Sequence, residues 1–355
     1  MKNILTDARW IGSHGIGRFA FHVLSRLPQH SQLRSGPPLL SPLDPLWLSY
    51  QIRLHRPDLF FSPGFSLPVT SVSPLVFTIH DLICVHLPGA SRTATYARKL
   101  YFQTLVRRAA RNAYRVLTVS EYSRRELLKW TGLDDNRVVN VGNGIDPVFT
   151  PAGARYDPGF DYILYVGNFK PHKNVGRLLA AFAQLEYSGL RLLLTGAGTP
   201  QLRATVAMLR VEERVHFLGR VTDSFLAELY RGALLLVQPS LTEGFGLPPV
   251  EAMACGTPVA VSRAASLPEV VGNAGMFFDP LDISDMRRAI EHAIGDTDLR
   301  RKMIAAGLTQ ASRFRWDDVA WKVSNVLDVA AAATQPSNQN CGDNSSHPAY
   351  DLDRV

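Results

Sequence analysis

Two carboxylates, Glu243 and Glu251, flank a glycine-rich turn just ahead of an expected helix. Gly244 and Gly246 let the backbone approach a ligand closely, and the proline after Leu247 marks the start of a helix whose free N–H groups attract an anion. Carboxylates accept hydrogen bonds from sugar or ribose hydroxyl groups and repel phosphate. The residues therefore favour a ligand with both phosphates and hydroxyl groups, such as a nucleotide sugar. A helix-dipole role for Glu251 and a solvated Glu243 would explain them equally well.

A lysine with matching chemistry follows the strand expected at Tyr162–Gly167. Lys173 precedes a helical pattern that begins at Val175, and Asn174 is placed to cap that helix. We expect the ammonium group to lie at the positive helix end, where a diphosphate would bind. Because cleavage of a sugar–phosphate bond leaves negative charge on the diphosphate, such a lysine would stabilise the transition state more than the ground state. A solvated loop lysine is the alternative.

Two motifs in the first half also follow expected strands. His80 ends the strand expected at Leu75–His80, with Asp81 directly after it. A lone histidine in this position is more often a hydrogen-bonded core residue than a catalyst. Gly15 and Gly17 precede an amphipathic helical pattern, and their N–H groups could reach a phosphate, although a Gly-x-Gly before a helix is common in tight turns.

The stretch Ser240-Leu-Thr-Glu-Gly-Phe-Gly-Leu-Pro-Pro-Val-Glu-Ala-Met-Ala-Cys-Gly-Thr-Pro-Val259 resembles the signature of retaining glycosyltransferases with the two-domain GT-B fold (glycosyltransferase family 4, group 1). It is most similar to their mannosyltransferase-like branch. The similarity extends, with gaps, from the first glycine loop to about residue 325. The resemblance implies that Glu243 contacts the donor sugar, Glu251 the ribose and Lys173 the diphosphate. It also implies that His80 faces the reacting centre.

The resemblance supplies a set of candidate site residues. The catalytic candidates are His80, Lys173 and Glu243, with Asp81 as a weaker candidate for the partner of His80. The donor-binding candidates lie in loops after expected strands, except Glu251, which is expected in the first turns of the following helix. They are Gly15, Gly17, Asn168, Lys173, Gly196, Arg220, Val221, Glu243, Gly244, Phe245, Gly246, Leu247 and Glu251. Asn168 departs from the family pattern, because many relatives have an arginine early in that loop. Either Lys170 supplies the second cation or the site has one cation fewer.

We therefore expect a retaining, metal-independent glycosyltransferase that moves a hexose from a nucleoside diphosphate sugar to a saccharide acceptor. The preferred donor is GDP-mannose, drawn from the His80-Asp81 and Lys170–Asn174 patterns, and UDP- and dTDP-linked sugars remain open. The acceptor is expected to be linked to a polyprenyl diphosphate in bacterial polysaccharide or O-antigen biosynthesis. No cofactor is expected beside the donor. The alternatives are a sugar-nucleotide hydrolase or epimerase on the same scaffold and a noncatalytic nucleotide-binding subunit.

Apolar runs alternate with helix-length segments, which predicts an α/β fold with two doubly wound Rossmann-like domains facing across a cleft. The 355 residues accommodate an acceptor-side domain at 1–155, a nucleotide-sugar domain at 156–315, a crossover helix at 316–332 and a disordered tail at 333–355. Residues 146–159, with three prolines and two glycines, form the expected linker. The expected strands are Lys2–Thr6, Asp58–Ser62, Leu75–His80, Arg115–Val119, Arg137–Val141, Tyr162–Gly167, Leu190–Thr195, Val215–Leu218, Leu234–Gln238, Pro258–Ser262 and Met276–Phe278.

The net charge of +7 is unevenly distributed, because residues 1–156 hold 19 Lys and Arg against 9 Asp and Glu and the remainder holds 19 against 22. Basic residues concentrate between Arg92 and Arg125, around apolar positions that include Leu100 and Phe102. Such a segment could contact an anionic membrane or an anionic lipid-linked acceptor, and a solvated helix face is the alternative. Zinc-finger spacing, RNA-binding motifs and repeats are missing, so no nucleic-acid partner is expected.

The remaining composition is that of a soluble globular protein, with 46% hydrophobic and 19% charged residues. An apolar run long enough to span a bilayer and a signal peptide are both missing, so we expect a cytoplasmic protein, free or at the inner face of the cytoplasmic membrane. Cys84, Cys255 and Cys341 are too widely spaced to indicate disulfides or a zinc site. The Asp-x-Asp pairs that begin at Asp296 and Asp351 do not follow strands, so no essential metal is expected.

Overall fold

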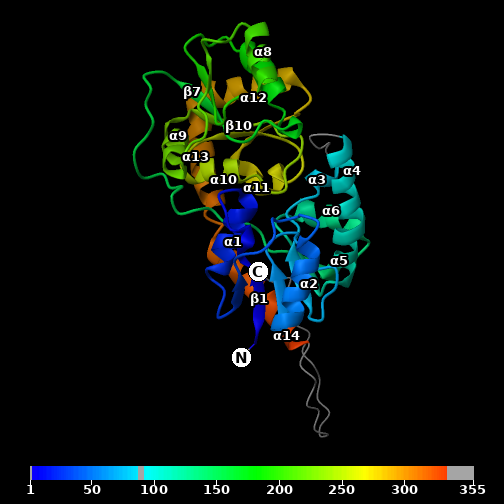
Figure 1. The fold of residues 1–355 in the computed structure, drawn as a ribbon. Coiled ribbons are helices and arrows are strands. Elements are labelled where there is room, and N and C mark those ends of the chain that lie inside the picture. The colour runs from blue at the N-terminus through cyan, green and yellow to red at the C-terminus, as the bar shows by residue number, and fades with distance from the viewer. Residues whose placement is uncertain (1, 87–91, 334–355) are drawn as a thin grey trace.

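The computed structural model of the chain describes residues 2–86 and 92–333. Two parallel sheets of six strands each organise these residues, which confirms the α/β fold with two doubly wound domains (Figure 1). The strand order is β2-β1-β3-β4-β5-β6 in the first sheet and β12-β11-β10-β7-β8-β9 in the second. The tail expected after residue 333, with Cys341 and the Asp351 pair, lies outside the described residues, as do the side chains of Arg92 and Arg98.

The strands of both sheets are short, and the residues of most of them are buried. Those of the first domain are β1 (Ile4–Asp7), β2 (Ser31–Leu33), β3 (Leu59–Ser62), β4 (Leu75–Thr78), β5 (Arg115–Thr118) and β6 (Val138–Asn140). Those of the second are β7 (Tyr162–Tyr165), β8 (Arg191–Leu194), β9 (Val215–Phe217), β10 (Leu235–Gln238), β11 (Val259–Ser262) and β12 (Met276–Phe278). Each expected strand corresponds to an observed strand within a few residues. The structure adds β2, which the sequence did not indicate.

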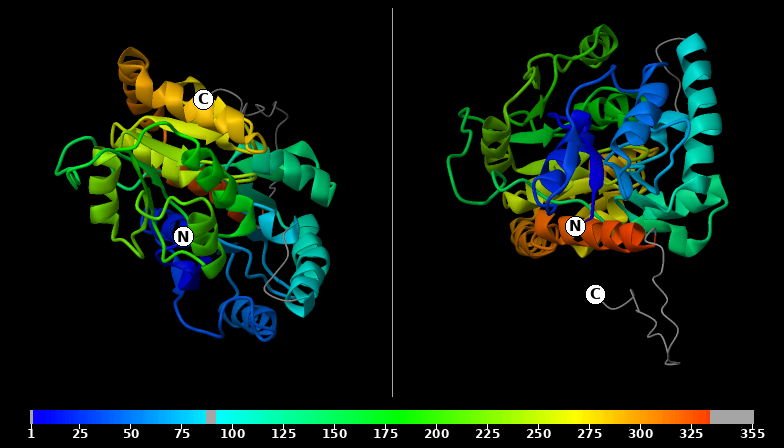
Figure 2. Two further views of the ribbon diagram at one scale, coloured as in Figure 1. Left: turned by 90° about the horizontal axis from the view of Figure 1, so that it is seen from above. Right: turned by 60° about the horizontal axis from the view of Figure 1, so that its bottom comes forward.

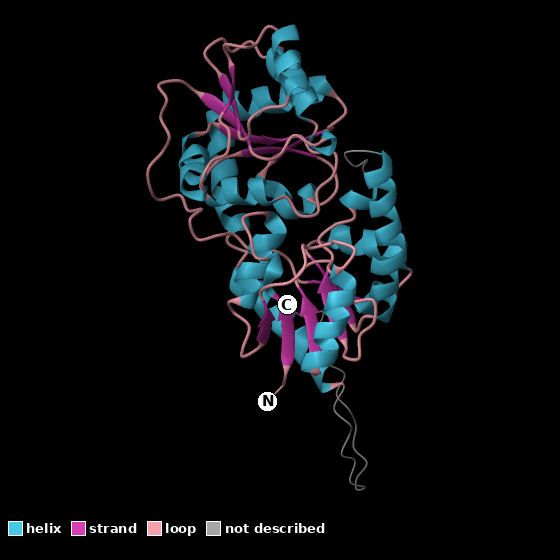
Figure 3. Ribbon diagram, viewed as in Figure 1, coloured by secondary structure: helices cyan, strands magenta, loops and turns pink. Residues whose placement is uncertain are grey.

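Helices cover both faces of each sheet (Figure 3). The first domain holds α1 (Gly15–Leu24), α2 (Asp44–His55), α3 (Ile83–His86), α4 (Arg92–Tyr101), a π-helical turn (Phe102–Val106), α5 (Arg107–Asn112) and α6 (Glu121–Thr131). The second holds α7 (Val175–Ala183), α8 (Pro200–Met208), α9 (Asp223–Gly232), α10 (Leu247–Ala254), α11 (Leu267–Val271), α12 (Ile283–Gly295) and α13 (Thr297–Ala311). Successive residues of β3 show why both faces need cover: Leu59 and Phe61 join one core cluster, and Phe60 joins another.

The last helix, α14 (Trp316–Ala332), crosses from the second domain to pack against α1, β3 and β5 of the first (Figure 2, right). Trp316 stacks on His22 of α1, with 4.5 Å between the ring centroids. A β-carbon at Gly144 would lie 2.5 Å from the Trp316 ring, so only glycine allows this approach. One core cluster therefore runs through both domains and α14.

Two local expectations are wrong. The Asn174 side chain does not cap α7; its Nδ2 donates instead to the carbonyls of Pro239 (3.0 Å) and Pro280 (2.7 Å). Gly15 and Gly17 lie within the first turn of α1 rather than before it, because the His14 ring accepts a hydrogen bond from the Gly17 N–H and starts the helix earlier.

Candidate active site

The carboxyl ends of the two sheets meet where α1, α3 and α6 of the first domain face α10 and α11 of the second (Figure 1). Gly244, in the turn after β10, lies directly against the first domain. A β-carbon at Gly244 would lie 2.9 Å from both the Asp81 side chain and the His80 carbonyl oxygen, after β4. The Gly244 carbonyl accepts hydrogen bonds from the hydroxyl groups of Ser120 (2.6 Å) and Ser123 (3.1 Å), at the start of α6. The loop motifs of both halves thus converge on one place.

Glu243 lies at the centre of a compact hydrogen-bond network. Its Oε1 accepts from the Lys173 ammonium group (2.6 Å), the Ser240 hydroxyl group (2.7 Å) and the Gln238 amide (2.9 Å). Oε2 accepts no hydrogen bond from any described residue. Both members of the Lys173–Glu243 pair are mostly buried, with side-chain exposures of 13% and 9%. The network fixes the carboxylate through one oxygen and leaves the other for a ligand.

His80 is buried beside this network. Its Nε2 lies 3.1 Å from the Pro63 carbonyl, which assigns the ring proton to Nε2 and leaves Nδ1 as an acceptor. Burial lowers the pKa of His80 to about 4, so the ring is neutral at pH 7. Burial raises the pKa of the neighbouring Asp81 carboxyl group, and the nearby Glu243 raises it further. The geometry gives His80 the properties of a neutral hydrogen-bond acceptor.

Glu251, in the second turn of α10, is buried and has partners on both oxygens. Oε1 accepts from the Arg18 guanidinium group (2.7 Å) across the domain boundary, and Oε2 accepts from the Tyr230 hydroxyl group (2.9 Å). Arg18 also pairs with Asp223 of α9. Burial raises the pKa of Glu251, and Arg18 opposes this shift. A ribose at Glu251 would have to share the carboxylate with Arg18 or displace it.

The start of α10 offers fewer N–H groups than a helix normally does. Pro248 and Pro249 follow Leu247, and neither carries an N–H. The donors available to an anion are therefore those of Gly246 and Leu247. Gly246 has φ 102°, and a β-carbon there would also lie 2.6 Å from Leu267. An anion at this position would therefore have fewer backbone N–H donors than expected at the start of a helix.

The other donor-binding candidates lie around the same boundary or fill structural places. A β-carbon on Gly15 would lie 3.8 Å from Leu247 across the boundary. The Arg220 guanidinium group donates to the Ser13 hydroxyl group of the first domain (3.1 Å). Gly196 and Gly219 pair through their backbones, and the exposed Asn168 accepts from the Lys170 N–H (3.1 Å). Phe245 belongs to the core, and the half-buried Val221 packs against it.

Sequence reasoning missed several residues that organise the site. Gln238, Tyr230, Asp223 and Arg18 were not singled out. Glu269 of α11 was also missed; its carboxylate accepts from the backbone N–H groups of Glu121 (2.6 Å) and Tyr122 (3.0 Å) at the start of α6. The position of Gln238 at the carboxyl end of an apolar strand was the one signal that could have drawn attention to it.

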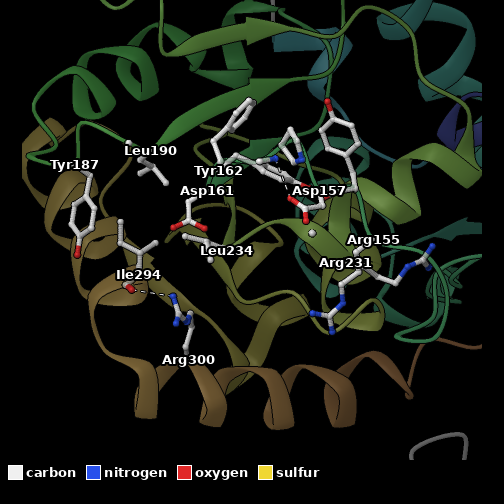
Figure 4. A pocket seen from close by; sticks show the side chains of 16 residues that line it. Arg155, Asp157, Asp161, Tyr162, Tyr187, Leu190, Arg231, Leu234, Ile294 and Arg300 are labelled. Atoms are coloured by element: carbon white, nitrogen blue, oxygen red, sulfur yellow. Dashed lines mark hydrogen bonds between the residues drawn. The ribbon is translucent and has the colours of Figure 1, made fainter.

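A hollow of about 1040 Å³ lies away from these residues, at the amino ends of β7, β8 and β10 (Figure 4). Asp161, Leu190 and Leu234 line it, together with arginines that include Arg231 and Arg300. Ligands of parallel α/β sheets bind at the opposite, carboxyl ends of the strands. The hollow is therefore separate from the candidate active site.

The described residues hold neither a metal-ion cluster nor a membrane-spanning helix. They contain no group of three or more His, Cys, Asp or Glu side chains arranged to hold a metal ion. They also contain no helix with the length and apolar character needed to cross a bilayer. Asp296 caps α13 through the N–H groups of Asp298 and Leu299.

Two family models and several known proteins are similar to this chain. The model of glycosyl transferases group 1 matches residues 154–310, and that of Glycosyltransferase Family 4 matches residues 10–149. O-antigen chain mannosyltransferase B of Escherichia coli is 30% identical over 302 residues, which cover 81% of this chain and 78% of that protein. Serotype-specific mannosyltransferase WbdA of Escherichia coli is 30% identical over 277 residues, or 72% of this chain, but this chain spans only 33% of that protein.

Solved structures show the same two-domain fold. Sucrose-phosphate synthase from Thermosynechococcus elongatus superposes with a TM-score of 0.74 at 20% identity, covering 94% of this chain and 100% of that one. HepE from Anabaena, solved in complex with UDP-glucose, superposes with a TM-score of 0.72 at 19% identity, covering 93% of this chain and 100% of that one. At these identities the likeness establishes the GT-B fold.

Proposed function

The chain belongs to the glycosyl transferases of group 1 and family 4, and from this premise we propose that it transfers a hexose from a nucleoside diphosphate sugar to a hydroxyl group of a saccharide acceptor. The enzyme class follows from the family. The donor, the stereochemical course and the acceptor are parts of the proposal. The proposed reaction retains the anomeric configuration and needs no metal ion.

One observation carries the proposal: the Lys173 ammonium group contacts Oε1 of Glu243, while Oε2 of Glu243 has no partner among the described residues. A cation beside a carboxylate with one open oxygen can receive a phosphate and a sugar hydroxyl group side by side. The pair lies where the loops of both sheets converge, so a donor bound there also meets the first domain. An ion pair or a histidine with a purely structural role would not need the loops of both sheets to meet at this place.

Each proposed contact with the donor has a physical basis. Lys173 and the N–H groups of Gly246 and Leu247 would bind the diphosphate, since they supply positive charge and unpaired donors. Oε2 of Glu243 would accept a hydrogen bond from a hydroxyl group of the donor sugar. Glu251, which accepts a hydrogen bond from Arg18, would bind the ribose. His80 would accept a hydrogen bond at Nδ1 from the donor sugar or the acceptor.

The proposed step breaks the bond between the anomeric carbon and the diphosphate oxygen and forms a bond from that carbon to the acceptor oxygen. The acceptor hydroxyl proton passes to the departing diphosphate. Lys173 favours this step because negative charge grows on the diphosphate as the bond breaks. Metal independence rests on this lysine and the adjacent N–H groups, which can balance that charge. Retention rests on the family resemblance.

Mannose from GDP-mannose is the proposed donor. It is supported by the relatives named as mannosyltransferases, which are 30% identical to this chain. The UDP-glucose in HepE keeps a UDP-sugar as the second candidate. A dTDP-sugar has no support beyond the shared scaffold.

The proposed acceptor is a growing O-antigen saccharide linked to a polyprenyl diphosphate, at the inner face of the cytoplasmic membrane. The support is the name of the relative from Escherichia coli and the basic charge of the first domain. A sugar-nucleotide hydrolase or epimerase would act on the donor without an acceptor. A noncatalytic subunit would bind the nucleotide and release no sugar.

Calorimetric titration with GDP-mannose, UDP-glucose and dTDP-rhamnose, without added metal, tests the donor. We expect selective binding of GDP-mannose. Preferential binding of UDP-glucose would overturn the GDP assignment, and binding of none would contradict the donor site itself. Incubation of the bound donor with and without saccharide acceptors then separates transfer from hydrolysis, because a hydrolase releases free sugar at the same rate in both.

A further inference from the structure

Large apolar side chains gather on one outer face of the first domain, over α2 and the loops beside it. Seven of the eighteen large apolar side chains that are exposed in the described residues lie between positions 40 and 72. The α2 stripe consists of Leu43, Leu46, Tyr50 and Leu54, which are 67%, 60%, 61% and 61% exposed. Spacings of three and four residues align these side chains along one side of the helix. Figure 2 (left) shows α2 at the outer edge of the molecule.

The opposite side of α2 already supplies the helix with its packing contacts. Leu48 and Ile52 are fully buried in the core of the first domain. The α2 stripe therefore adds nothing to the packing of the domain, and its exposure leaves apolar surface in water. A helix that is apolar on two sides needs a second apolar environment.

The loop after β3 extends this apolar surface. Val69 and Val72 are 46% and 63% exposed. The loop is fixed against α2, because the Val69 N–H donates to the Pro45 carbonyl (3.3 Å) and the Thr70 N–H to the Ser49 hydroxyl group (3.2 Å). Residues 63–74 carry no charged side chain. The exposed apolar surface is thus held rigidly in place.

The exposed Asp, Glu, Lys and Arg side chains of residues 31–57, the segment that carries the α2 stripe, are all positive. Arg34, Arg53 and Arg56 are exposed. Asp44 is the one acidic residue between positions 31 and 57, and it is fully buried in an ion pair with Arg9 (2.7 Å). A surface with apolar side chains, arginines and no exposed carboxylate in this segment complements an anionic lipid surface. Two copies of the same cationic face would repel each other.

We propose that the α2 stripe docks the protein on a membrane that contains anionic lipids. The apolar side chains enter the boundary between head groups and acyl chains, and the flanking arginines contact the lipid phosphates. This surface differs from the basic segment between Arg92 and Arg125, which the sequence indicates as a membrane contact. The proposal names the surface that would hold the protein at the membrane of the proposed acceptor. It can be tested without donor or acceptor, so either proposal can fail alone.

Sedimentation of the full chain with lipid vesicles tests the apolar part of the surface. The probes are vesicles of phosphatidylcholine with and without phosphatidylglycerol. We expect Leu46→Gln, Tyr50→Gln and Leu54→Gln, combined in one variant, to lower the partition coefficient on the anionic vesicles by about tenfold or more. The control variant, Met208→Gln with Trp321→Gln, removes two equally exposed apolar side chains from elsewhere and should bind as the wild type does.

A second pair of variants tests the charge. Arg34→Gln with Arg53→Gln should lower binding to the anionic vesicles by about tenfold and leave the weak binding to phosphatidylcholine unchanged. Lys302→Gln with Lys322→Gln removes the same charge from the second domain and α14 and should have little effect. Circular dichroism checks that each variant is folded, and the single variants Leu46→Gln and Tyr50→Gln repeat the test with less change.

Two results would overturn the proposal. One is equal vesicle binding by the wild type and the Leu46, Tyr50 and Leu54 variant, including the case in which neither binds. The other is a wild-type dimer in light scattering that the same variant dissociates, since the α2 stripe would then be the interface with a second copy.

Discussion

The guanidinium group of Arg18 in the first domain lies 2.7 Å from the carboxylate of Glu251 in the second. The two residues are 233 positions apart, and their contact joins the start of α1 to α10, the helix that follows the active-site turn. If Glu251 binds the donor ribose, nucleotide recognition depends on a side chain from the opposite domain. Donor binding and domain closure are then linked.

Replacement of Arg18 by Gln should make donor binding depend on pH. Arg18, Asp223 and Tyr230 surround Glu251; burial raises its pKa, and loss of Arg18 would raise it further. A carboxyl group with a raised pKa loses its charge as the pH falls. As the pH is lowered from 8 to 5, we expect the affinity of Arg18→Gln for GDP to begin to fall at a higher pH than that of the wild type. Calorimetry across this range measures it.

The matched control is Asp223→Asn, which removes a charge that raises the pKa of Glu251 and should shift the dependence the other way. Parallel pH curves for the wild type and Arg18→Gln would show that Arg18 does not act through Glu251.

Gly244→Ala should disrupt the contact between the domains without unfolding either. Its β-carbon would lie 2.9 Å from Asp81 and from the His80 carbonyl, so the turn and the His80 loop must move apart. A displacement of this kind typically lowers kcat/KM by about a hundredfold. Gly176→Ala, at a helical position with no atom within 4 Å, is the control for an added methyl group. Wild-type kcat/KM in Gly244→Ala would contradict the observed domain contact.

His80 should make the stability of the protein depend on pH. Burial lowers its pKa to about 4, below the usual 6.5, so the folded protein binds fewer protons than the unfolded chain between these values. Stability is therefore fully present above about pH 6.5 and falls as the pH drops toward 4, by at most about 3 kcal/mol. Urea unfolding from pH 7 to pH 4.5 measures this loss. His80→Gln should show a smaller loss. An unchanged dependence of stability on pH would mean that His80 takes up its proton at the same pH in the folded protein and in the unfolded chain.

A chelator should leave the transfer activity unchanged. The proposed site balances the diphosphate charge with Lys173 and the N–H groups of Gly246 and Leu247. We expect equal initial rates after dialysis against EDTA and after addition of Mg²⁺ or Mn²⁺. A loss that metal restores would refute metal independence.

The sequence predicted the fold well because the signal for each strand is local. β3 and β10 are continuous apolar runs, and a parallel strand covered on both faces needs such a run. The edge strand β2 was missed, since its three residues include only one buried side chain. The starts of helices were predicted less well. His14 rather than a glycine caps α1, and the Asn174 side chain donates to two loop carbonyls instead of capping α7.

The sequence indicated candidate site residues within separate motifs, but not the contacts between those motifs. Glu243, Gly244 and Gly246 stand together in the sequence, whereas Lys173 reaches Glu243 from 70 positions away. Spacing alone gives no indication of such a contact, nor of the Gly244 carbonyl accepting from Ser120. Long-range pairing between domains depends on how the two sheets are oriented, and no local pattern encodes it.

Binding of GDP and GDP-mannose to the wild type, Lys173→Met and Glu243→Gln tests the central claim most directly. If Lys173 holds the diphosphate and Glu243 the sugar, Lys173→Met should weaken both ligands by about tenfold or more. Glu243→Gln should weaken GDP-mannose alone and leave GDP unchanged or tighter, because the neutral amide no longer competes for the lysine. If both variants bind both ligands as the wild type does, the Lys173–Glu243 pair is not the donor site.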